Sequence, residues 1–218
     1  MNYFGDAQTL LSEARTEFEA VKALYELALN EQDAEMLRLA TKIKHLLEDS
    51  RSALDYATHG LVDKYGRMPA EHRSVQFPYA RENQNRETFV QNLPNRIPGV
   101  TTSRPDVIDV LAGFQHFGEV FGRGSTWLPR FMELANENKH RNLTPQTART
   151  MLHVTLTVEI PAGATIEIPW PLTADGPGQL SSVVKKAFMF SSTDIPVLMF
   201  LEETLSRVEQ IVAELSAF

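Results

Sequence analysis

The residues best suited to chemistry lie in two short segments that are far apart in the chain. Arg51, Asp55 and His59 recur at steps of four, which places them on one flank of a helix, where Asp55 can pair with either neighbour. The second segment, 136–142, reads Asn-Glu-Asn-Lys-His-Arg-Asn and combines an imidazole with two cations. Both segments carry groups that can move protons or bind anions.

The second segment is predicted to end a helix that starts near Trp127. Asn138 falls in step with Phe131 and Leu134, so its amide should point toward the helical core and needs hydrogen-bond partners there. Lys139 and the two residues after it supply further donors and one titratable ring.

If the two segments are adjacent, an aspartate, two histidines and two arginines converge, a set that suits phosphodiester chemistry. His140 would act as general acid or base and Arg141 would hold the phosphate, while Asp55 would orient them. The binding residues expected around them are Arg51, His59, Asn138 and Lys139. The alternative is a structural cluster, in which Asp55 accepts hydrogen bonds from the turn at 139–141 and His140 caps helix carbonyls.

These segments need a framework, and the sequence predicts one around a single long helix, Asp33 to Tyr65. Its apolar and small residues recur at alternating steps of four and three, which keeps one seam against a partner helix through four heptads. The seam comprises Met36, Ala40, Ile43, Leu47, Ser50, Leu54, Ala57, Leu61 and Tyr65. A first helix, capped by Asp6 and ending near Asn30, should fold back antiparallel because the connection is short.

Residues 66–104 are less regular and rich in proline. Val75–Tyr79 is predicted to be extended, since Phe77 precedes a proline and is steered away from helix. A short helix is expected over Asn85–Leu93. The segment also holds the richest arginine run of the chain, which consists of Arg67, Arg73, Arg81, Arg86, Arg96 and Arg104.

Composition shifts near residue 150. Apolar and polar residues alternate over Leu152–Ile160, which predicts a half-buried strand, with Thr165–Trp170 as its antiparallel partner and Val183–Phe190 as a third strand. A last helix beginning near Pro196 carries a second apolar seam.

The predicted fold class is therefore α+β, mainly α. It is an antiparallel helical bundle around the helix at 33–65, with a small antiparallel sheet at about 151–190 and a C-terminal helix at about 195–216. We expect a single domain over 1–218, in which residues 1–149 and 194–218 form the bundle and 150–193 a β appendage.

Composition limits the partners. The net charge of −7 disfavours general coating of nucleic acid, but the acids concentrate in 1–37 and 194–218 and leave a weakly basic centre that could receive an anion. Cysteine is absent, which fits a reducing compartment and removes thiolate chemistry. The sequence shows no secretory signal and no apolar run long enough for a membrane span, so we expect a soluble cytoplasmic protein.

Four motifs occur in a fixed order: 51–56 (RSALDY), 77–78 (FP), 136–141 (NENKHR) and 196–203 (PVLMFLEE). From about residue 36 onward, this series resembles a bacterial family of helical proteins with no established activity, whose members show patterns like LRSALDH, FP and NxDKHR. The chain has Asn138 where that family tends to have Asp, and Tyr56 where it tends to have His. Both departures weaken the case for a second catalytic carboxylate or histidine.

The helical layout is also distantly similar to HEPN domains, many of which are metal-independent ribonucleases in phage defence or toxin systems. Their motif is Arg, four to six residues, then His. The match here runs from Arg67 to His72, in a loop interrupted by Pro69, so the resemblance is one of architecture.

Metal and cofactor chemistry have no sequence support. No HExxH motif is present, and the glycines at 118, 122 and 124 lack the lysine of a phosphate-binding loop. The first function left open is an RNA-directed enzyme, a metal-independent ribonuclease or a defence or toxin component. The second is a non-enzymatic interaction or scaffold module, forming a homodimer or partner complex through the apolar seams. The third is a bundle that binds a small molecule beside Arg51 and Arg141.

Overall fold

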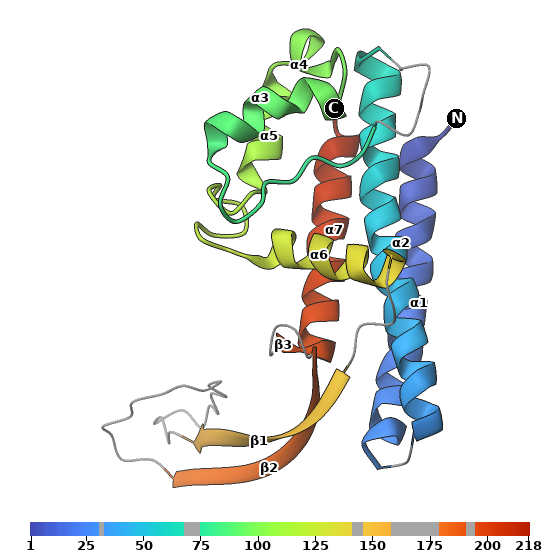
Figure 1. Cartoon of the computed structure of the whole chain (residues 1–218), viewed down its shortest axis with the longest axis vertical. Helices are drawn as coiled ribbons and strands as arrows, with labels where there is room; N and C mark the ends of the chain where they lie inside the picture. Colours follow the sequence, from blue (N-terminus) through green and yellow to red (C-terminus); the bar gives the residue numbers. More distant parts are fainter. Residues whose placement is uncertain (31–32, 68–74, 141–145, 158–178, 191–194) are drawn as a thin grey trace, which may run out of the picture. The chain divides into compact units, whose positions relative to one another are not determined.

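The computed structural model describes residues 1–30, 33–67, 75–140, 146–157, 179–190 and 195–218 (Figure 1). Side chains are described for these residues except 30, 33–34, 137–140, 146–157 and 179–186. Two units make up the chain, Met1–Thr144 with Leu198–Phe218, and Pro145–Val197. The predicted fold class is confirmed: the protein is mainly helical, with a small antiparallel sheet and a C-terminal helix.

The first unit is built on a long antiparallel helix pair, α1 (Tyr3–Asn30) and α2 (Asp33–Tyr65) (Figure 1). The bounds of α2 are those predicted from its heptads. Its seam is fully buried at Ile43, Leu47, Leu54 and Leu61. Ser50 is also buried, and its hydroxyl donates to the Leu46 carbonyl at 2.7 Å, so the small polar residue leaves no unsatisfied group in the seam.

The start of α1 differs from the prediction. The helix begins at Tyr3, and the Asn2 side chain accepts a hydrogen bond from the Gly5 N–H at 3.1 Å. Asp6, expected to be the cap, lies instead in the first turn, where its negative charge interacts favourably with the positive end of the helix dipole. Local polarity therefore identified the helix start to within one turn.

After α2, the chain forms α3 (Arg86–Arg96), α4 (Val100–Ser103) and α5 (Asp106–Gly113). Asn85 caps α3, because its side chain accepts from the Thr88 N–H at 2.9 Å. The end of α2 approaches the α3–α4 connection so closely that a Cβ on Gly66 would lie 2.6 Å from the Pro98 carbonyl oxygen. Glycine at this position is what allows the close approach.

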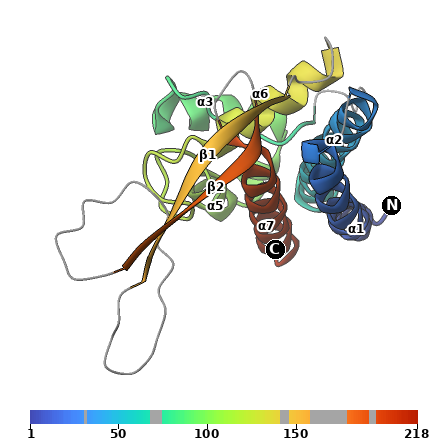
Figure 2. The ribbon, with the colours of Figure 1, turned by 90° about the horizontal axis from the view of Figure 1, so that it is seen from below.

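Two further helices complete the unit, α6 (Trp127–His140) and α7 (Val197–Ser216), which belongs to it from Leu198 onward. In Figure 2, α1, α2 and α7 are seen nearly end-on, whereas α6 lies across them. The Trp127 indole N–H donates to the buried Thr204 hydroxyl at 3.0 Å, which joins α6 to α7. α6 also packs against α2.

In its described residues, the second unit forms a three-stranded antiparallel sheet in the order β1-β2-β3. β1 (Gln146–Thr157) pairs with β2 (Gln179–Phe190), and the short β3 (Ile195–Pro196) pairs with the end of β2. The strand expected at Leu152–Ile160 thus pairs with the strand expected at Val183–Phe190. The expected partner at Thr165–Trp170 lies outside the described residues.

The sheet unit, Pro145–Val197, extends a few residues beyond the β appendage expected at 150–193. The expectation of one domain over 1–218 stays a prediction. Among the described helices, none combines the length and apolar character that crossing a bilayer requires.

Candidate functional site

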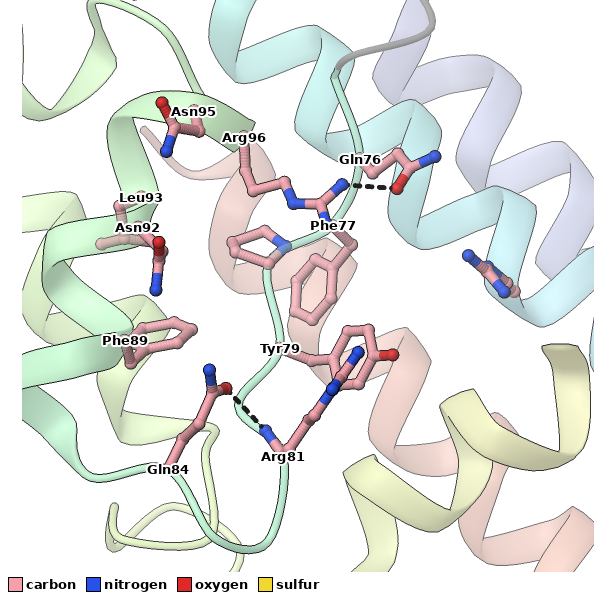
Figure 3. Close-up of a pocket in the computed structure, with 12 residues that line it drawn as sticks. Gln76, Phe77, Tyr79, Arg81, Gln84, Phe89, Asn92, Leu93, Asn95 and Arg96 are labelled. Carbon is pink, nitrogen blue, oxygen red and sulfur yellow. Dashed lines mark hydrogen bonds between the residues drawn. The ribbon is translucent and has the colours of Figure 1, made fainter.

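A cavity of about 440 Å³ lies in the first unit, between α2, the segment 75–84 and α3 (Figure 3). This volume is within the range of sites that bind small molecules or single groups of larger ones. Arg51 lines it from α2, and the residues that line it from the segment are Gln76, Phe77, Pro78, Tyr79, Arg81 and Gln84. The residues that line it from α3 are Phe89, Asn92, Leu93, Asn95 and Arg96.

The segment 75–81 has no helical or strand structure, and side chains from other elements hold its backbone. The Phe77 N–H donates to Asp55 Oδ1 at 2.8 Å, and the Ala80 N–H donates to Gln115 Oε1 at 2.8 Å. Gln115 is only 1% exposed, and its amide nitrogen donates to the Leu111 carbonyl at 2.8 Å, so its orientation is determined. One wall of the cavity is therefore built by irregular chain whose N–H groups at Phe77 and Ala80 are satisfied by side chains of other elements.

Apolar packing holds the same wall and the facing helix. Val75 and Phe77 are each 2% exposed and Ala80 is fully buried, so the segment cannot leave the unit without exposing apolar surface. On α3, Phe89 is 3% exposed and contacts the edge of the Phe117 ring, with the ring centroids 5.7 Å apart. The cavity is thus lined from elements that are well anchored.

The cavity is rich in arginine and, among the described residues that line it, contains no acid. Arg96 reaches across from α3 and donates to Gln76 Oε1 at 2.7 Å (Figure 3). Arg51 donates to Asn136 of α6. Both partners are neutral amides, so the positive charges are oriented without being neutralised.

This lack of carboxylate partners sets the cavity apart. Arginines elsewhere in the described part of the chain form ion pairs, namely Arg15, Arg38, Arg86, Arg104, Arg123, Arg130 and Arg207. Those without an ion pair to a described residue are Arg51, Arg67, Arg81 and Arg96, and all but Arg67 line the cavity. Among arginines with described side chains, those without an ion pair are therefore concentrated in the cavity.

The α2 half of the predicted site lies within the described residues, and its members make different contacts there. Arg51 lines the cavity, and Asp55 holds the segment that forms one of its walls. His59 stacks on the ring of Tyr3 in α1, with the ring centroids 5.5 Å apart. Among the described residues, the regular spacing along one flank of α2 thus does not give these three side chains a single common contact.

The other half of the predicted site lies largely outside what is described. Asn138, Lys139 and His140 belong to α6, but their side chains are outside the described set, and Arg141 is outside the described residues altogether. The nearest described contact is that of Arg51 with Asn136, which joins α6 to the middle of α2. The convergence of His140 and Arg141 with Asp55 stays a prediction.

Sequence reasoning singled out Arg51 but missed Arg81 and Arg96 as members of the same site. The density of arginine in 66–104 was the available signal. It could not separate these two from Arg86 and Arg104, which form ion pairs with Asp109 and Asp106. Only the packing of α3 against the segment makes that distinction.

Comparison of the chain with models of protein families, with characterised proteins and with solved structures finds no match. The bacterial-family and HEPN resemblances accordingly remain predictions.

Proposed function

We propose that this protein binds RNA, or another phosphate-bearing anion, in the arginine-lined cavity. The observation that carries the proposal is that Arg51, Arg81 and Arg96 line one cavity and have no carboxylate partner among the described residues. A guanidinium group offers a planar fork of N–H donors that matches the oxygens of a phosphate. Such a cavity attracts an anion and orients it.

The overall charge of the chain favours a local site rather than an extended binding surface. At a net charge of −7, the protein as a whole repels a polyanion. A small cluster of unpaired arginines can still bind a few phosphates, because screening at physiological salt limits repulsion from charges more than about 8 Å away. Binding should therefore be modest in affinity and centred on the cavity.

Cleavage of the bound RNA is the more specific form of this proposal, as in the HEPN-like ribonucleases. His140 would exchange protons with the ribose hydroxyl and the leaving oxygen, and Arg141 would stabilise the charge on the phosphate. The packing of α6 against α2 and the contact of Arg51 with Asn136 support it, because they bring the helix that carries His140 next to a cavity arginine.

Fluorescence anisotropy with labelled single-stranded RNA tests binding. The variant is Arg81→Ala/Arg96→Ala, and the matched control is Arg38→Ala/Arg123→Ala, which removes the same charge from two exposed arginines outside the cavity. We expect at least a tenfold loss of affinity in the first and little change in the control. Equal losses in the two, or no binding of RNA or inorganic phosphate by the wild type, would contradict the proposal.

Cleavage is tested with the same RNA in the presence of a metal chelator. The wild type is expected to produce shorter fragments and a His140→Ala variant to produce none, while both bind RNA equally. If the wild type binds RNA and leaves it intact, the binding proposal stands and the ribonuclease proposal fails.

The second proposal is the non-enzymatic interaction module. The two apolar seams that suggested it are buried within the chain, at Leu47 and Leu61 in α2 and at Leu205 and Val212 in α7. A homodimer or partner complex must therefore use another surface. The exposed apolar residues that favour the proposal are Leu27, near the end of α1, and Leu37, near the start of α2, which are 52% and 63% exposed. A monomeric mass at high micromolar concentration would exclude the homodimer.

A further inference from the structure

We propose that the cavity is a single-nucleotide pocket, which binds one nucleoside monophosphate unit through both its phosphate and its base. This inference rests on the proposed function and makes it more specific. The unit is either a free nucleotide or one nucleotide of an RNA strand, since both present the same chemistry to the pocket. Its evidence is the combination of cationic, aromatic and amide side chains within about 440 Å³.

The size of the cavity limits what can enter. About 440 Å³ accommodates one small molecule and excludes a duplex or a run of stacked bases. Single-stranded RNA is recognised in this way when a base leaves the stack and enters a protein pocket. A longer strand would continue across the surface outside the cavity.

The base has an aromatic surface available in Tyr79. Phe77 and Phe89 are almost fully buried, so they form the floor of the cavity, whereas Tyr79 is only partly buried. The Tyr79 hydroxyl makes no hydrogen bond with a described residue. In Figure 3, the side chains of Tyr79 and Arg81 extend on the same side of the segment, so a base stacked on Tyr79 brings its phosphate toward an arginine.

The amides can read the edge of the base. Gln84 Oε1 accepts from the Arg81 N–H at 2.9 Å, which leaves the Gln84 NH₂ group free to donate. Asn92 Nδ2 donates to the Thr88 carbonyl at 2.8 Å, which leaves its oxygen free to accept. The Asn95 side chain makes no hydrogen bond with a described residue. The pocket therefore offers both donors and acceptors, as the Watson–Crick edge of a base requires.

The arginines would bind the phosphate of the nucleotide. Arg51 and Arg96 each donate to one neutral amide and keep further N–H groups, because a guanidinium has five. Arg81 has no side-chain hydrogen bond to a described residue. Inorganic phosphate would use only these arginines, whereas a nucleotide would also use Tyr79, and this difference makes the inference testable.

Isothermal titration of the full chain separates the two modes. The probes are inorganic phosphate, the four nucleoside 5′-monophosphates, the uncharged nucleosides and a short single-stranded RNA. We expect at least one nucleotide to bind about tenfold more tightly than phosphate, because stacking on an aromatic side chain contributes that much per base. Displacement of labelled RNA by the nucleotide would identify the same site for both.

Two variants locate the base. Tyr79→Leu should weaken nucleotide binding about tenfold and leave phosphate binding unchanged, whereas Tyr79→Phe should retain the affinity because it keeps the ring. In the wild type, 2-aminopurine riboside monophosphate should lose fluorescence on binding, which reports stacking without any substitution. If the RNA strand binds with the same dependence on Tyr79 and free nucleotides do not bind, the unit is supplied by RNA and the inference stands.

Failure of the inference is distinguishable from failure of the proposed function. If phosphate and nucleotides bind equally, the fluorescence is unchanged and Tyr79→Leu has no effect, the cavity binds phosphate alone and the single-nucleotide pocket is overturned. If Arg81→Ala/Arg96→Ala leaves the binding of every anion unchanged, both the single-nucleotide pocket and the proposed function are overturned.

Discussion

The backbone N–H of Phe77 donates a 2.8 Å hydrogen bond to Oδ1 of Asp55. The contact ties the middle of α2 to the irregular segment that carries Tyr79 and Arg81 into the cavity wall. Since Phe77 precedes Pro78, which has no N–H, this bond is the backbone anchor at the centre of the segment. Asp55 is therefore a positioning residue for the cavity.

Replacing Asp55 should loosen the cavity wall. We expect Asp55→Ala to lower the free energy of unfolding by about 1–3 kcal/mol, because the Phe77 N–H loses a charged acceptor. The midpoint of thermal unfolding should fall by roughly 2–4 °C per kcal/mol, and phosphate affinity should fall with it. Asp55→Asn keeps an oxygen acceptor and should be milder. An unchanged midpoint for Asp55→Ala would contradict this role.

Removing the hydrogen bond between Gln115 and the Ala80 N–H should lower stability by a similar amount. Gln115→Leu fits the buried volume but leaves the Ala80 N–H without its acceptor, so urea unfolding should show a loss of about 1–3 kcal/mol. Gln91→Leu, at an exposed position on α3, is the matched control and should change stability by less than about 0.5 kcal/mol. Equal effects of the two substitutions would mean that Gln115 does not support the segment.

A carboxylate on α2 links stability to pH. Burial raises the pKa of Asp49 above its ordinary value of 3.8; His45 opposes the shift, and the acids at 13, 48 and 17 add to it. The folded protein therefore binds more protons than the unfolded chain just above pH 3.8, and stability falls as pH rises through the raised pKa. Ionised Asp49 thus opposes folding at pH 7.

Asp49→Asn should accordingly raise the thermal midpoint at pH 7 by up to about 2 °C. The gain should shrink as pH falls toward and below 3.8, where the wild-type carboxyl becomes neutral in both states. Glu133→Gln, at an exposed position in α6, removes the same charge and serves as the control. A gain that does not depend on pH would mean that Asp49 acts through packing instead.

Salt dependence should report the number of RNA phosphates that the protein neutralises. With the cavity arginines on the single phosphate of one bound nucleotide, the logarithm of the association constant should fall against the logarithm of salt concentration with a slope of about −0.7. In Arg81→Ala/Arg96→Ala the slope should become shallower, while Arg38→Ala/Arg123→Ala should keep the wild-type value. A slope steeper than about −5 would indicate an extended binding surface.

Much of the helical framework could be predicted because its signals are local. The heptads of α2 gave its bounds at Asp33 and Tyr65, and Asn85 marked the start of α3. The strand pairing was harder, since alternation identifies a strand without choosing its partner. β1 pairs with β2, which contains the strand expected at Val183–Phe190, while its expected pairing with Thr165–Trp170 lies outside the described residues and stays a prediction.

The sequence by itself determined where the long helices lie, that the arginines gather between α2 and α5, and that Phe77-Pro78 interrupts regular structure. These properties depend on neighbours within a few turns of chain. Only the tertiary structure decided that Arg51, Arg81 and Arg96 share one cavity while Arg86 and Arg104 pair with acids. That choice depends on how α3 and the segment before it pack against α2, through contacts such as Phe77 with Asp55, which no local spacing encodes.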